Sequence, residues 1–290
     1  MFFPEPRPPS RRARRRVDIG RGVGYLRPVM SALVAALGRR TLEGLASIGQ
    51  GALLLLELVK LLPATWKVRH QVGEQMHVVL IGSLPLAITT SVFVGAVTAV
   101  QAVYQMEAYV PMSYLGAVVS KSVFIELGPV LVALVVGSRL CANYAAELGT
   151  MKVTEQLDAL EMLAIDPMHF LGLPRFLAAM LMMPVLTVFA DGVAILSGYF
   201  VSVATMGVTD TTFQEGMLTF YKGSDLASGL IKSFIFGAII AMSGLYFGFR
   251  TRGGAEGVGN ATMMAVVASC LSILVADYLL AILLFQVIFG

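Results

Sequence analysis

The chain has 290 residues, of which 57% are hydrophobic and only 13% are charged, with a formal net charge of +3. Soluble domains carry about 25% charged residues, so this sequence holds too few charges to cover a water-facing surface. The composition argues against a soluble enzyme, a disordered chain and a nucleic-acid-binding protein. Its apolar stretches are continuous, whereas the strands of a membrane β-barrel alternate apolar and polar residues. The predicted fold class is an all-α polytopic membrane protein.

The chain starts with a basic segment, residues 1–38, in which five arginines lie between Arg11 and Arg16. Basic clusters favour the anionic cytoplasmic leaflet of a membrane, by about 1 kcal/mol for each residue near the surface. No apolar core directly follows the arginines, so the segment is not typical of a signal peptide. We predict a flexible tail, which either binds the membrane surface or stays in solution.

Residues 39–62 have apolar residues at helical spacing, interrupted by polar and charged ones such as Glu43, Glu57 and Lys60. This stretch is too short and too charged to cross a membrane, and Pro63 ends it. It is typical of an interfacial helix that lies among the lipid headgroups. We therefore predict an interfacial amphipathic region over residues 39–77, followed by a transmembrane domain over residues 78–290.

The transmembrane domain contains five long apolar segments. Each exceeds the about 20 residues that a helix needs to cross the hydrocarbon core. Pro85, Pro129 and Pro184 interrupt three of them, which membrane helices tolerate. Pro85 leaves open a division of the first segment into a re-entrant piece and a true span, which would give six. The five predicted spans are 78–106, 114–139, 170–205, 228–249 and 261–288.

Basic residues flank these spans unevenly. The connections at 139–175 and 250–258 hold five lysine and arginine residues, whereas those at 106–113 and 206–227 contain a single lysine, Lys222. Basic connections stay on the cytoplasmic side. The N-terminus and the two basic connections are therefore predicted to be cytoplasmic and the C-terminus periplasmic. The polar outer loop 207–225 is expected to form a short helix on the membrane.

One connection between spans, residues 147–166, is predicted to be an amphipathic helix. Val153, Leu157, Leu160 and Ala164 would form its apolar stripe, with charged residues on the opposite face. Gly149 is expected to separate this helix from the second span, Thr150 to cap it and Pro167 to end it. From composition alone, the segment is either a docking site for another protein or a solvated connector that rests on the membrane.

Several ionisable residues fall inside the predicted spans. They are Lys121, Glu126, Asp191, Lys232 and Asp277. An intramembrane charge costs about 2.5–3.5 kcal/mol on insertion scales, so such residues usually face a cavity or pair with each other. The two lysines can also extend towards the membrane surface. Glu126 is the best cavity candidate because a proline lies nearby and loosens the helix.

The sequence gives little support for catalysis or metal binding. It contains no phosphate-binding loop of the GxxxxGK[ST] type and no GxSxG motif. The two cysteines are far apart, and the three histidines lack metal-ligand spacing. We expect a chain that is not an enzyme and that holds no cofactor.

The run from Glu126 to Arg175 carries a distinctive series of motifs. It begins with ELGP, continues with a Gly-x-Arg and the stretch AELGTMKVTEQLDALEMLAIDP, and closes on Pro-Arg. In these motifs the chain resembles the MlaE-type permease family of lipid-transporting ABC systems, over roughly residues 40–289. Residues 1–40 lie outside the resemblance.

The resemblance implies partners. Two copies of the permease would form a homodimer, two cytoplasmic ABC ATPase subunits would bind ATP and Mg²⁺ below it, and a hexamer of MCE-domain proteins would lie in the periplasm. The amphipathic segment would be the coupling helix that docks on the ATPase. Its predicted contact residues are Glu147, Lys152, Glu155, Gln156, Leu157, Asp158 and Leu160.

The resemblance also implies a lipid-binding cavity in the membrane, with Gln101, Tyr104, Glu126 and Lys232 at its wall. The family has a basic residue before the ELGP glutamate, where this chain has Ile125. Lys121 or Lys232 would then have to recognise an anionic headgroup.

The function predicted from this resemblance is that of the permease subunit of an ABC transporter for phospholipid. Two other classes remain open. An ion-coupled secondary transporter would use intramembrane carboxyl groups such as Asp191 and Asp277 as relays. A membrane-embedded lipid-modifying enzyme would change its substrate chemically.

Overall fold

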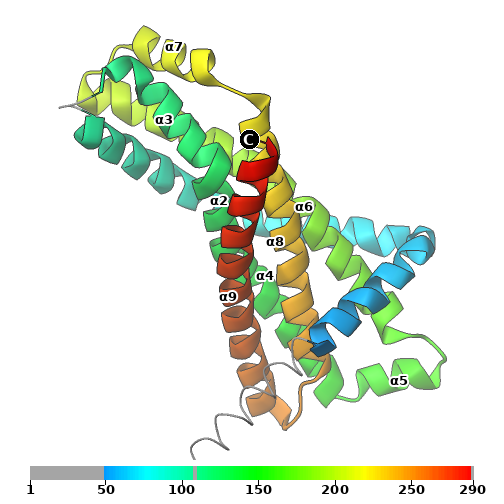
Figure 1. Cartoon of the computed structure of the whole chain (residues 1–290). Helices are drawn as coiled ribbons and strands as arrows, with labels where there is room; N and C mark the ends of the chain where they lie inside the picture. Colours follow the sequence, from blue (N-terminus) through cyan, green and yellow to red (C-terminus); the bar gives the residue numbers. More distant parts are fainter. Residues whose placement is uncertain (1–48, 107–109, 289–290) are drawn as a thin grey trace, which may run out of the picture. The chain divides into compact units, whose positions relative to one another are not determined.

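A computed structural model describes residues 49–106 and 110–288 (Figure 1). The predicted tail, residues 1–38, and the first part of the predicted interfacial helix, residues 39–48, lie outside the described residues. Apart from Gly49 and Gln50, the described chain belongs to one compact unit, Gly51–Gly290. Helices joined by short turns make up this unit, and no strand occurs in the part of the chain that the structure describes.

Residues 51–61 are helical, and twelve labelled elements follow them. Two of these, η3 and η4, are π-helical turns, and η1 and η2 are 3-10 helices. In chain order the elements are η1 (Leu62–Val68), α2 (Arg69–Met106), η2 (Met112–Tyr114), α3 (Leu115–Ser122), η3 (Val123–Leu127), α4 (Gly128–Val153), α5 (Gln156–Met162), η4 (Met168–Gly172), α6 (Leu173–Met206), α7 (Asp210–Phe220), α8 (Gly223–Phe249) and α9 (Gly254–Ile288).

Five helical segments of the described chain are long and apolar enough to cross a membrane, which confirms the predicted number. They are Arg69–Met106, Met112–Val153, Met168–Met206, Gly223–Phe249 and Gly254–Leu284. Helix α2 runs through Pro85 without a break, so the division of the first segment that the sequence left open does not occur. The second segment continues past its predicted end at residue 139 as far as Val153. The expected short helix in the 207–225 loop is α7.

The spans pack through small residues. Helix α2 lies along α6, and α8 contacts α4, α6 and α9. The Gly95 backbone on α2 lies against the Ala194 carbonyl on α6, so closely that a Cβ at Gly95 would collide with it. A Cβ at Gly244 on α8 would collide with Tyr144 Cβ on α4, and the Cys141 carbonyl lies next to it. Such contacts bring helix backbones together where lipid provides no hydrophobic driving force for association.

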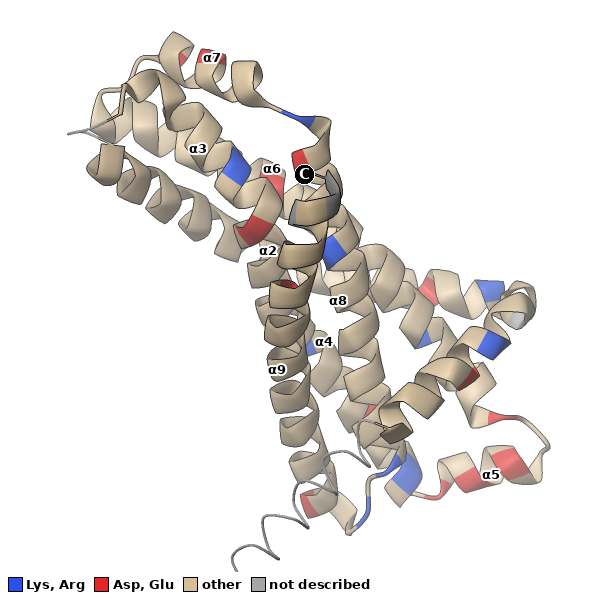
Figure 2. Ribbon diagram, viewed as in Figure 1, with Lys and Arg blue, Asp and Glu red and all other residues tan. Residues whose placement is uncertain are grey.

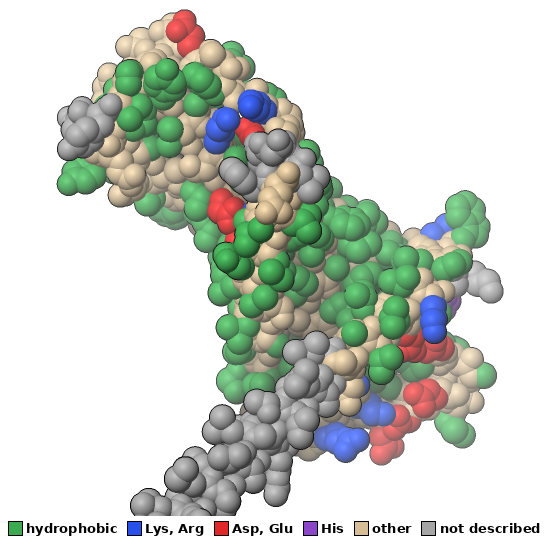
Figure 3. All heavy atoms as spheres, in the orientation of Figure 1, with side chains coloured by type: hydrophobic (Ala, Val, Ile, Leu, Met, Phe, Trp, Pro, Cys, Tyr) green, Lys and Arg blue, Asp and Glu red, His purple; other side chains and the backbone are tan. Residues whose placement is uncertain are grey.

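The two ends of the compact unit differ in what they carry. Helices α3 and α7 and the last turns of α9 lie at one end, here called the α7 end, and α5 and the α8–α9 turn lie at the opposite end, the α5 end (Figure 1). Apolar side chains cover most of the visible surface between the two ends (Figure 3). Helix α5 carries acidic residues, and basic residues lie along the neighbouring chain segments (Figure 2). This distribution is the one expected of a chain that crosses a bilayer.

The segment before α2 has features of the membrane interface. Leu54 and Leu58 are buried in the hydrophobic core, whereas Leu53 and Leu56 are exposed. Trp66 is also exposed, and the Arg69 guanidinium lies 4.7 Å from the centre of its ring. Tryptophan and arginine at the end of a span are typical of the headgroup region. Residues 69–77 of the predicted interfacial region belong to α2, so the first span begins earlier than predicted.

Candidate functional site

A buried network of three charges joins three spans. Lys232 on α8 is only 1% exposed, and its Nζ donates a hydrogen bond of 2.6 Å to Glu126 Oε2 in η3. The same Nζ forms an ion pair of 2.9 Å with Asp277 Oδ1 on α9. A charge in the membrane interior is stable only when it is paired. Lys232 therefore holds α8, η3 and α9 together, and it does not extend to the membrane surface.

A proline explains why the helix widens at Glu126. Pro129 has no backbone N–H, so it cannot donate to the carbonyl group of Ile125, four residues earlier. The turn Val123–Leu127 is π-helical, and the Gly128 N–H donates to the Val123 carbonyl, five residues back. π-Turns inside α-helices are frequent at functional sites. Sequence analysis found the proline but did not predict the π-turn.

Glu126 and Gln101 line the same cavity, which has a volume of about 430 Å³. The cavity lies between α2 on one side and α3 with η3 on the other. Glu126 is nearly half exposed, so its carboxylate reaches both the cavity and Lys232. The full lining is Val97, Thr98, Gln101, Ala102, Gln105, Val118, Ser122, Glu126 and Leu127.

The other two residues predicted for the cavity wall do not line it. Tyr104 is 78% exposed and is not part of the lining. Lys232 lies behind Glu126, because burial against two carboxylates holds it away from the open space. Lys121 also pairs with a carboxylate, at 3.5 Å from the buried Asp225. Sequence analysis did not predict either the Asp277 or the Asp225 pairing.

Asp191 lies on α6 and is buried against Gly128 of α4. Its Oδ1 has no hydrogen-bond partner among the described residues. Any side chain at position 128 would collide with this carboxyl group. The glycine of ELGP therefore makes room for an acidic residue from another span.

The predicted coupling helix begins and ends at different residues from those expected. Helix α4 continues through Gly149 to Val153, and α5 covers only Gln156–Met162. Gly149 does not break the helix. Its missing side chain leaves room for Thr251, which packs against it. Thr150 donates to the Ala146 carbonyl and caps nothing. The chain turns instead at Glu155, whose φ of 60° is left-handed.

Two contacts fix α5 to the rest of the chain. Lys152 Nζ at the end of α4 lies 2.7 Å from Asp158 Oδ1 on α5. Leu157 is only 2% exposed, so it anchors α5 on its own chain and cannot be the surface contact that the sequence predicted. The predicted contact residues Glu155 and Gln156 are exposed, and Leu160 is partly buried. Met162 and Leu163, at 88% and 71% exposure, form an apolar tip that the sequence analysis missed.

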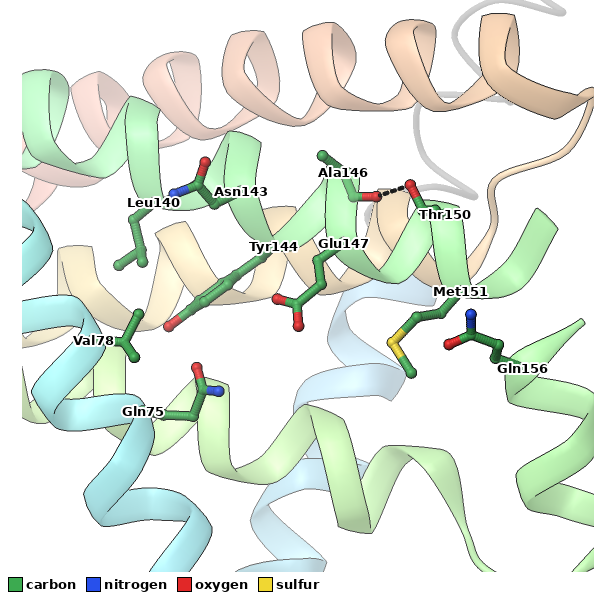
Figure 4. A pocket seen from close by; sticks show the side chains of 10 residues that line it. All are labelled: Gln75, Val78, Leu140, Asn143, Tyr144, Ala146, Glu147, Thr150, Met151 and Gln156. Atoms are coloured by element: carbon green, nitrogen blue, oxygen red, sulfur yellow. Dashed lines mark hydrogen bonds between the residues drawn. The ribbon is translucent and has the colours of Figure 1, made fainter. Parts of the chain in front are cut away.

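The ends of the spans on either side of α5 are joined by an ion pair. Arg175 on α6 is 4% exposed, and its Nη2 donates to Glu147 Oε1 on α4 over 2.6 Å. Its Nη1 donates to the Leu171 carbonyl over 2.9 Å. Glu147, predicted to contact a partner, is therefore engaged within its own chain. It also lines a recess of about 810 Å³ at the α5 end, where Glu147 and Tyr144 of α4 face Gln75 of α2 (Figure 4).

Replacing Glu147 with Gln is expected to destabilise the chain by about 1–3 kcal/mol, because the buried Arg175 guanidinium loses its charged acceptor. The measurement is the melting temperature of the purified protein in detergent. Glu161→Gln, at an exposed position of α5, is the matched control. Adding Arg175→Met to Glu147→Gln should restore part of the loss, since no buried charge then remains unpaired. An unchanged melting temperature for Glu147→Gln would contradict this role.

Comparison with known proteins decides the family. The model of the family described as Permease MlaE matches residues 72–283. The chain belongs to the MlaE permease family. It is 40% identical over 218 residues to a probable ABC transporter permease protein of Synechocystis, covering 75% of this chain and 83% of the relative.

Two other MlaE relatives have more specific names. The chain is 31% identical over 253 residues to the intermembrane phospholipid transport system permease protein MlaE of Haemophilus influenzae, covering 87% of this chain and 97% of the relative. It is 37% identical over 204 residues to the chloroplastic protein TRIGALACTOSYLDIACYLGLYCEROL 1 of Arabidopsis thaliana, covering 70% of this chain and 58% of the relative. The five candidate spans agree with a multi-pass membrane protein of this permease family.

Proposed function

We propose that this chain is the permease subunit of an ABC transporter that moves phospholipid between the inner membrane and MCE-domain proteins in the periplasm. The observation that carries the proposal is the continuous helix α4. It joins η3, where Glu126 lines the cavity, to the α5 segment at the opposite end. A motor that moves α5 can therefore change the cavity through one rigid element. The name of the Haemophilus influenzae relative supports phospholipid as the substrate.

The proposed orientation places the α5 end in the cytoplasm and the α7 end in the periplasm. Lys152 at the end of α4 pairs with Asp158 of α5, and Arg250 and Arg252 belong to the α8–α9 turn, so all three are at the α5 end, which agrees with the excess of basic residues in cytoplasmic connections. The N-terminus is then cytoplasmic, and the fifth span brings the C-terminus to the periplasm. In this assembly two permeases form a homodimer, two ATPase subunits dock on the α5 segments, and an MCE hexamer covers the α7 end.

The proposed mechanism is mechanical. ATP and Mg²⁺ bind to the ATPase subunits, and their closure moves α5. The Lys152–Asp158 and Glu147–Arg175 pairs keep α5 attached to α4 and α6, so the movement reaches both spans. ATP hydrolysis drives lipid movement only if the two conformations bind lipid with different affinities. The surroundings of Glu126 differ between these two conformations, because Glu126 directly precedes α4 and α4 moves with α5.

The test is reconstitution of the permease in liposomes with the ATPase and MCE proteins that co-purify from native membranes. We expect labelled phospholipid to reach the MCE protein only with ATP, unchanged in mass and insensitive to a protonophore. Transfer that continues without ATPase and stops with the protonophore would contradict the proposal. It would favour the ion-coupled alternative, for which the unpartnered oxygen of Asp191 is the supporting observation. A chemically altered lipid would indicate an enzyme.

A further inference from the structure

The cavity wall has hydrogen-bonding groups but no cation among the described residues that line it. The amides of Gln101 and Gln105, the hydroxyls of Thr98 and Ser122 and the carboxylate of Glu126 face the space. The remaining lining residues are apolar. Glu126 is the one ionisable group in this lining.

The nearest lysines do not supply the missing positive charge. Lys232 is 1% exposed and lies between Glu126 and Asp277, so this network has one cation and two carboxylates. With all three groups ionised, the network carries a net charge of −1. Lys121 faces Asp225 and does not line the cavity. In that ionisation state, a ligand in the cavity meets an excess of negative charge.

This charge distribution discriminates between phospholipid headgroups. Every phosphodiester brings one negative charge, and a like charge close to Glu126 raises the energy of the complex in a medium of low dielectric constant. An ammonium group on the headgroup neutralises the phosphodiester and donates hydrogen bonds to the Glu126 carboxylate. A headgroup without an ammonium group leaves the repulsion uncompensated.

We infer that the cavity selects zwitterionic, ammonium-bearing phospholipids over anionic ones, and that Glu126 determines this specificity. The inference rests on the proposed function, because it assigns the substrate class of the same cavity. Lys232 is a positioning residue in this account. It holds the Glu126 side chain at the wall through the 2.6 Å hydrogen bond and does not touch the headgroup.

The experiment uses the reconstituted complex and liposomes that contain equal amounts of phosphatidylethanolamine and phosphatidylglycerol with identical acyl chains. Mass spectrometry of the lipid delivered to the MCE protein gives the ratio of the two. We expect phosphatidylethanolamine to be enriched about fivefold, the discrimination expected of one partly exposed charge pair. Glu126→Gln keeps the shape and an acceptor for Lys232, so it should transport lipid at a ratio near one. The matched control is Glu215→Gln, at an exposed carboxylate of α7 outside the cavity, which should keep the wild-type ratio.

The outcomes separate the two proposals. Equal delivery of both lipids by the wild-type complex, a preference for phosphatidylglycerol, or an unchanged ratio in Glu126→Gln would each overturn the headgroup assignment and leave the transport function standing. Absence of ATP-dependent delivery of any lipid would overturn the proposed function itself. A second measurement needs no ATPase: the lipid that co-purifies with the permease in detergent should be enriched in phosphatidylethanolamine for the wild type and not for Glu126→Gln. An equal ratio in both proteins would overturn the assignment.

Discussion

Lys232→Met is expected to destabilise the permease by about 3–5 kcal/mol, the usual effect of removing one partner from a buried ion pair. The substitution leaves Glu126 and Asp277 close together inside the membrane without the cation that both contact. We expect low yields of folded protein and a lower melting temperature in detergent. Lys222→Met, which removes an exposed lysine from the turn before α8, is the matched control and should behave like the wild type.

A compensating variant tests whether the unpaired carboxylates cause this loss. Lys232→Met combined with Asp277→Asn leaves Glu126 as the one carboxylate of the network, at the wall of the cavity. The double variant should recover a substantial part of the lost stability. If it is no more stable than Lys232→Met, shape and packing determine the stability of this region, and the charge network does not.

Leu163→Asp is expected to reduce co-purification of the ATPase at least about tenfold, the scale of losing one binding hot spot. Leu163 is 71% exposed at the apolar tip beyond α5, so the substitution costs the isolated permease little stability. At the proposed interface with the ATPase, the substitution would replace an apolar contact by a buried carboxylate. The measurement is the amount of ATPase retained after affinity purification of the tagged permease.

The matched control for this prediction is Leu218→Asp on α7. Leu218 is 68% exposed, and it belongs to the end opposite α5. It should leave the ATPase bound. Loss of the ATPase in both variants would indicate a general folding defect, and retention in Leu163→Asp would show that this tip is not the docking surface.

The number of spans was predictable because a helix that crosses a membrane must be both long and apolar, and the sequence shows both properties directly. A bilayer core of fixed thickness requires about 20 apolar residues, and each of the five segments exceeds that length. The prolines did not change the number of spans, since α2 and α6 run through Pro85 and Pro184 without ending. The bounds were less predictable. Gly149 has the local propensity to end a helix, but packing against Thr251 decides its role.

The charged residues of the network were recognised from the sequence, whereas their pairing was not, and only two of the four residues predicted for the cavity wall line it. An intramembrane charge needs a partner, so Glu126, Lys232 and Asp277 were all recognised as unusual. Which of them meet depends on how η3, α8 and α9 are arranged, and a single sequence does not contain that information. The same limit applies to Glu147, whose partner Arg175 lies on a different span. The family resemblance also implied that Leu157 contacts a partner, whereas tertiary packing buries it.

Photo-crosslinking in intact cells tests the central claim, that α5 receives the ATPase on the cytoplasmic side. A photoreactive amino acid replaces Glu161, an exposed residue of α5, or Glu215, an exposed residue of α7. The account predicts that position 161 crosslinks to an ABC ATPase and that position 215 crosslinks only to periplasmic or membrane proteins. A crosslink from position 215 to the ATPase, or from position 161 to a periplasmic protein, would contradict it.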